Sequence, residues 1–94
     1  MTEELKELIK EAAETLKSYG AKDVYVFGSA AEGRVDEYSD IDMAVSGLPP
    51  GVFFRAWARA VRAFPGREMD LISLDNDGPF ADYLKLEGKL ERVG

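Results

Sequence analysis

The chain contains no cysteine and no histidine among its 94 residues. Without cysteine it can form no disulfide and no thiolate site, which is typical of proteins from reducing compartments. Without histidine it has no His-ligated zinc site and must use another group as a general base. Any bound metal must therefore be held by oxygen ligands, which favours Mg²⁺, Mn²⁺ or Ca²⁺.

An excess of positive charge and a long apolar run are also missing. The net charge is -6, so we expect no direct binding of nucleic acid, because such proteins usually present a basic field. No apolar run approaches the ~18 residues that cross a membrane. The first ten residues, MTEELKELIK, predict a charged amphipathic helix rather than a signal peptide, so we expect a cytoplasmic protein. The length predicts a single domain over residues 1–94.

The pattern of apolar residues predicts alternating helices and strands in an α+β fold, in the order αβ(α)βαβα. The tail that follows, 89–93, is read either as a short strand or as a cover for a sheet edge. The loop between the first two strands is shorter than a parallel crossover requires, which favours antiparallel pairing there. Helices are predicted over 3–19, 52–64 and 79–88, with one or two turns near 29–34, and strands over 23–28, 39–46 and 67–74.

Three aspartates occupy strand positions where the pattern calls for apolar residues. Asp40 and Asp42 share one face of the second predicted strand, because the strand period is two. Asp70 lies in the third predicted strand and joins them if that strand lies beside the second. Carboxylates crowded in this way repel one another, and bound divalent cations would remove the conflict. Two such ions, about 3.5–4 Å apart, suit an in-line displacement at phosphorus.

Gly28 and Ser29 end the first predicted strand, just before a short helix. Glycine allows close approach of a ligand, and a helix N-terminus favours a phosphate group. Taken alone, a Gly-Ser pair is typical of an ordinary turn, and an Asp-x-Asp pair is typical of a loop, a cap or a solvated edge. Asp70 alone is typical of a paired core charge or an edge residue. Their occurrence together on successive strands favours a site that holds a nucleoside triphosphate and metal ions.

This combination resembles the DNA polymerase β-like nucleotidyltransferases. Gly28-Ser29, ten intervening residues, Asp40-x-Asp42 and a later strand aspartate, Asp70, carry the resemblance. The stretch FGSAAEGRVDEYSDIDMAV is most similar to the minimal nucleotidyltransferase (MNT) family of bacteria and archaea, which includes MntA-type antitoxins. The similarity extends over nearly the whole chain, including MDLISL and the closing YLKLEGKLERV.

The resemblance implies a palm-like fold, with a three-stranded mixed sheet flanked by helices. It implies that Gly28 and Ser29 contact the triphosphate and that Asp40 and Asp42 bridge two Mg²⁺ ions, with Mn²⁺ as a possible replacement. It further implies that Asp70 helps to bind the catalytic ion and positions or deprotonates the acceptor hydroxyl.

One position departs from the family pattern. Many members have Ala-Arg-Gly after the Gly-Ser pair, whereas this chain has Ala31-Glu32-Gly33. Arg34 follows and is a candidate replacement for the arginine that contacts phosphate.

The resemblance implies transfer of AMP from ATP to a hydroxyl of an all-helical HEPN-type partner, in a toxin–antitoxin pair and in a homo- or hetero-oligomer. The alternative is a non-catalytic antitoxin with a relict nucleotide site, which neutralises its partner by binding. Glu32 and the absence of a second domain motivate that alternative. A free-standing small-molecule adenylyltransferase is a third reading, against which the lack of an acceptor-binding domain argues.

The second long helix has two further features. Arg55, Arg59 and Arg62 form one stripe, which is either a solvated face or a docking surface for an acidic partner or for phosphates. Phe54 lies off the apolar stripe and is either part of the core or an exposed interface anchor.

Overall fold

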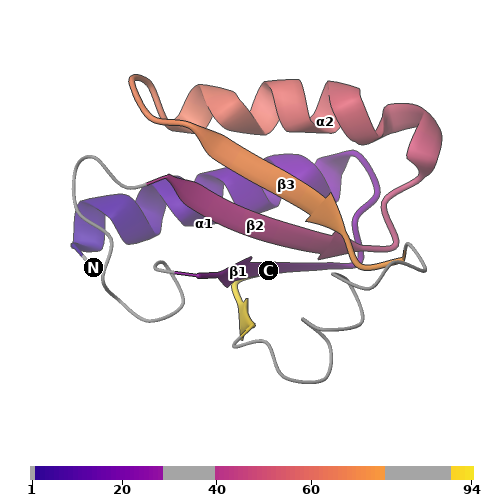
Figure 1. Ribbon diagram of the computed structural model, residues 1–94, viewed down its shortest axis with the longest axis horizontal. Coiled ribbons are helices and arrows are strands. Elements are labelled where there is room, and N and C mark those ends of the chain that lie inside the picture. The colour runs from indigo at the N-terminus through magenta and orange to yellow at the C-terminus, as the bar shows by residue number, and fades with distance from the viewer. Residues whose placement is uncertain (1, 29–39, 76–89) are drawn as a thin grey trace.

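The computed structural model describes residues 2–28, 40–75 and 90–94. Figure 1 shows the helices α1 and α2 running side by side across one face of a β-sheet. The predicted helix over 79–88 and the predicted turns near 29–34 lie outside the described residues. The elements are α1 (Glu3–Ser18), β1 (Asp23–Phe27), β2 (Ile41–Ser46), the 3₁₀ turn η1 (Pro50–Val52), α2 (Phe53–Ala60), the 3₁₀ turn η2 (Val61–Ala63), β3 (Met69–Ser73) and β4 (Glu91–Arg92).

The first helix begins and ends where the sequence predicts, to within a residue. Thr2 caps α1, since its hydroxyl accepts a hydrogen bond of 3.1 Å from the Leu5 N–H. The helix buries an apolar stripe against the sheet and leaves its charged side in solvent. Gly20 follows with a φ of +117°, a backbone conformation that side chains disfavour. Within the described residues, no helix is long and apolar enough to cross a bilayer.

The sheet is mixed, and its strands are ordered β3-β2-β1-β4. β1 pairs antiparallel with β2, as the short connection predicts, and β2 pairs parallel with β3 through the crossover that contains α2. The prediction of three strands is corrected to four, because β4 pairs antiparallel with β1. The tail is therefore a short strand rather than only a cover. Beyond β4, the Gly94 carbonyl accepts a hydrogen bond from the Val24 N–H.

The two faces of the sheet have different neighbours. The helix face is covered by α1 and α2, and alternate strand residues such as Val26, Met43 and Leu71 are buried there in the main core. The opposite face is called here the aspartate face. It carries a smaller apolar cluster centred on Ala44 and Leu74. It is made by Tyr25, Phe27, Asp42, Ala44, Asp70 and Ile72.

The second long helix is less regular than the predicted span of 52–64. Only Phe53–Ala60 is α-helical, and a 3₁₀ turn stands at each end. Proline lies at the start of η1, where its fixed φ suits the first turn, and Pro65 follows Phe64 at the other end. The helix buries Ala56 and Ala60 against α1 and the sheet, so small residues allow close packing at this contact.

Candidate active site

Asp42 and Asp70 lie directly beside each other on neighbouring strands. In the parallel pairing of β2 with β3, the register sets Asp42 opposite Asp70 and Ile41 opposite Met69. The Ile41 N–H donates to the Glu68 carbonyl over 2.9 Å, which fixes the register at the start of both strands. Because side chains alternate along a strand, both aspartates lie on the aspartate face. The condition on which the sequence argument depended, that β3 lies beside β2, is therefore met.

Asp42 lies in an environment that disfavours its charge. Partial burial raises the pKa of the Asp42 carboxyl, and the charges of Asp70 and then Asp40 raise this pKa further. The charges of Asp70 and Asp40 thus both act on the Asp42 carboxyl. Crowding of like charges at a partly buried position is typical of functional sites rather than of structural surface acids.

Asp40 does not lie in the strand, contrary to the prediction of a strand over 39–46. β2 begins at Ile41, and Asp40 is an exposed residue immediately before it. The reason is that ladder pairing starts at Ile41, so Asp40 is at the end of the connecting segment. Its charge still reaches Asp42, which accounts for its effect on the pKa of that carboxyl.

Gly28 is next to the aspartates because of the pairing between β1 and β2. Phe27 is the register partner of Asp42, and Gly28 follows with a φ of +66°. A Cβ atom at Gly28 would come within 2.8 Å of Asp42 Oδ2. A side chain at this position would be strained by the left-handed backbone, and it would also displace the Asp42 carboxylate. Asp42 thus lies on the side of Gly28 where a Cβ atom would point, and the predicted contact of Gly28 with a triphosphate stays a prediction.

The remaining predicted phosphate contacts cannot be placed. Ser29 and Arg34 lie outside the described residues, as does Glu32. Their roles stay predictions from the sequence.

Trp57 supports the site in a way that its apolar pattern did not reveal. Its indole Nε1–H donates a hydrogen bond of 2.8 Å to the Met69 carbonyl, one residue before Asp70. The helical spacing of apolar residues predicts Trp57 as part of the apolar stripe of this helix. The available signal was that a partly buried indole N–H usually finds an acceptor. Trp57 is therefore a positioning residue for the start of β3.

The donor set suits a divalent cation in its chemistry. Hard cations prefer carboxylate oxygens, and a positive charge would offset the repulsion that acts on Asp42. Among residues 2–28, 40–75 and 90–94, however, no three acidic side chains gather closely enough to hold one metal ion. The pair Asp42 and Asp70 is the part of the set whose adjacency the strand register supplies.

The chain combines a mixed sheet with helices on one face, the paired Asp42 and Asp70 on the other, and the turn at Gly28 beside them. The chain belongs to the nucleotidyltransferase domain family, whose pattern matches residues 5–92. This confirms the family expected from the motif, and the fold agrees apart from the added fourth strand.

Solved structures support the same fold. A toxin–antitoxin crystallised with AMP-PNP has a TM-score of 0.69 and 19% identity, covering 99% of this chain and 73% of that chain. A mutant of the toxin–antitoxin MntA-HpeT has a TM-score of 0.65 and 15% identity, and the match covers 89% of this chain and 70% of that chain. At these identities the likeness concerns the fold alone. A search of curated proteins returned no match.

Proposed function

We propose that the chain is a Mg²⁺-dependent nucleotidyltransferase that transfers AMP from ATP to a hydroxyl of an all-helical HEPN-type partner protein. The observation that carries this proposal is the register pairing of Asp42 with Asp70, beside Gly28, whose left-handed backbone lies against the Asp42 carboxylate. Membership of the nucleotidyltransferase domain family supports the reaction class. The likeness to toxin–antitoxin structures, one of them with AMP-PNP, supports the nucleotide and the kind of partner.

In the proposed reaction, the acceptor hydroxyl oxygen bonds to the α-phosphorus of ATP. The bond from that phosphorus to the bridging oxygen breaks, pyrophosphate leaves, and the hydroxyl proton is released. Divalent cations, when bound, would screen the triphosphate and make the hydroxyl more acidic. Asp40 and Asp42 would supply the shared ligands. Asp70 is exposed at the same register as Asp42, so its carboxylate is accessible to the acceptor and can orient it or take its proton.

The test is to purify the tagged chain with its native partner and incubate the complex with ATP and Mg²⁺. Intact-mass spectrometry should detect one or more AMP units on the partner, with an equal amount of pyrophosphate released. Asp42→Asn should slow transfer by more than about 100-fold, since even residues that only orient a metal ligand contribute about 10–100-fold. Glu14→Gln is the matched control, because it removes an exposed carboxylate from the far side of α1.

Absence of an AMP adduct on a partner that demonstrably binds would exclude this function. A second candidate, a non-catalytic antitoxin, is then favoured. It is motivated by the finding that no three acidic side chains among the described residues gather at one point. In that case, Asp42→Asn should neutralise the partner as well as the wild-type chain does.

A further inference from the structure

The side of α2 that faces away from the sheet differs in charge from the rest of the chain. It is called here the α2 outer face. Between Pro49 and Arg67 the sequence has four arginines and no acidic residue, although the chain as a whole carries a net charge of -6. This concentration of one sign makes the surface complementary to an acidic protein. The face consists of five exposed residues: Phe54, Arg55, Ala58 and Arg59 on α2, and Arg62 on the adjoining turn η2.

The arginines of this face have no ion-pair partner in the part of the chain that the structure describes. Two cations elsewhere in the described residues do have partners, since Arg92 contacts Asp23 at 2.6 Å and Lys6 contacts Glu3 at 3.4 Å. Guanidinium groups bind carboxylates through two parallel hydrogen bonds. The outer-face arginines therefore retain their donors for a second molecule.

Phe54 adds an apolar anchor to the same face. Its side chain is 75% exposed, which makes it the one large hydrophobic residue exposed among those described. Its ring stacks on that of Trp57, at 6.2 Å between centroids, and meets Phe53 edge to face at 5.5 Å. Trp57 is in turn fixed by its hydrogen bond to Met69. An exposed aromatic ring held in place by its neighbours has the character of an interface hot spot.

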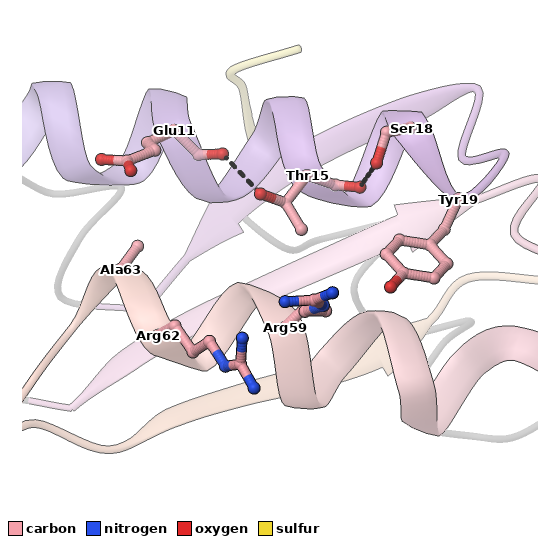
Figure 2. Close-up of a pocket in the computed structure, with 7 residues that line it drawn as sticks. All are labelled: Glu11, Thr15, Ser18, Tyr19, Arg59, Arg62 and Ala63. Atoms are coloured by element: carbon pink, nitrogen blue, oxygen red, sulfur yellow. Dashed lines mark hydrogen bonds between the residues drawn. The ribbon is translucent and has the colours of Figure 1, made fainter.

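A groove of about 410 Å³ lies between α1 and α2, next to the basic part of this face. Figure 2 shows Arg59 on α2 and Arg62 on η2 beside the groove, opposite Glu11 and Thr15 on α1 and with Tyr19 at one end. A projecting side chain of a partner could enter this groove while its carboxylates contact the arginines. The surface thus has a groove that can receive a side chain of the partner, and an exposed ring, Phe54, that can enter a pocket of the partner.

We propose that the α2 outer face is the docking surface for the partner protein, and that the partner presents acidic residues around an apolar pocket that receives Phe54. This inference rests on the proposed function for the existence of the partner. It adds that docking is separate from transfer. The reason is that α2 covers the helix face of the sheet, whereas Asp42 and Asp70 lie on the aspartate face.

The test uses the partner identified by the co-purification described above. Calorimetry should give a Kd for Arg59→Glu that is weaker than wild type by about tenfold or more. Lys10→Glu is the matched control, because it makes the same change in net charge on α1 and should leave the Kd within about twofold of wild type. Phe54→Ser should weaken binding as Arg59→Glu does. Asp42→Asn should bind normally. Circular dichroism verifies that each variant is folded.

A second measurement identifies the charge partner. An acidic residue of the partner that is crosslinked to the α2 outer face is changed to arginine, and this variant should restore binding to Arg59→Glu. Equal weakening by Arg59→Glu and Lys10→Glu would overturn the proposal, because net charge alone would then explain the effect. A dimer of the free chain that Arg59→Glu converts to monomer would overturn it in favour of self-association. Normal binding without AMP transfer would refute only the proposed catalysis.

Discussion

The same strands build both faces of the sheet, but the helix face buries apolar residues whereas the aspartate face carries paired carboxylates. On the helix face, Met43 and its neighbours are buried among apolar side chains of both helices. On the aspartate face, one residue away along the strand, Asp42 is half-buried with Asp70 beside it. Successive residues of β2 thus serve different purposes, because side chains alternate along a strand. Met43 contributes to the buried core, and Asp42 belongs to the candidate site on the opposite face. Each face should therefore be open to change with little effect on the other.

The largest effect is expected from the helix face. Met43→Ala should lower the free energy of unfolding by about 2–5 kcal/mol, because it leaves a cavity in the main core. Ile72→Ala is the comparison on the aspartate face, where the side chain is only half-buried, and it should cost clearly less. Urea denaturation followed by circular dichroism gives both values. Equal losses would show that the two faces contribute alike to stability.

The next effect concerns Gly28, where a substitution should affect both stability and the candidate site. Gly28→Ala should cost about 1–2 kcal/mol because its φ of +66° is left-handed. It should also weaken Mg²⁺-ATP binding, because the new Cβ would meet Asp42 Oδ2. Gly66→Ala is the control, since its φ is +77° but no atom lies within 4 Å of the added Cβ. If both variants bind Mg²⁺-ATP alike, the contact with Asp42 has no part in the site.

A smaller effect is expected at Trp57, which lies on the helix side of the sheet and holds the start of β3 next to Asp70. Trp57→Phe should cost about 1 kcal/mol, because the Met69 carbonyl loses its hydrogen bond. The start of β3 would be held less firmly, so transfer should slow by more than the fall in folded fraction explains. Thermal unfolding and initial rates of pyrophosphate release measure the two quantities. A rate that merely follows the folded fraction would reduce Trp57 to a core residue.

The smallest effect is a dependence of stability on pH. The pKa of Asp42 is raised in the folded state, so its charge opposes folding at neutral pH, and this penalty is lost as pH falls through the raised pKa towards the unfolded value. In buffer with EDTA, Asp42→Asn should be more stable than wild type at pH 7, by less than about 1 kcal/mol because solvent screens the half-buried group. The gain should vanish near pH 3. A gain that persists there would indicate a cause other than charge.

The sequence predicted those parts of the fold that depend on local pattern. The cap at Thr2 and the alternation around Met43 located α1 and β2 correctly, apart from the start of β2. The parallel pairing of β2 with β3 is a long-range property that spacing along the chain does not specify. The role of β4 was left open for the same reason, since a two-residue strand exists only through its partner β1.

For the candidate site, the sequence led to one conditional neighbour relation, while the other contacts come from the structure alone. Asp42 and Asp70 were paired on the condition that their strands are neighbours, and the structure meets that condition. The contact between Gly28 and Asp42 could not be foreseen, because it depends on the register of β1 against β2 and on a positive φ. The hydrogen bond from Trp57 to Met69 crosses from helix to sheet, which no pattern within one element reveals.

The pairing of Asp42 with Asp70 also ties the candidate site to the register of β3 against β2, because only this register places both carboxylates on one face. If β3 slipped by one residue against β2, Asp70 would turn towards the helices and an apolar neighbour such as Leu71 would face outwards. The slipped molecule would bury a charge among apolar side chains and would also lose its paired carboxylates. If the proposed function holds, misassembled molecules are both unstable and inactive. In a preparation of this protein, the fraction able to bind Mg²⁺-ATP should equal the fraction that has folded correctly.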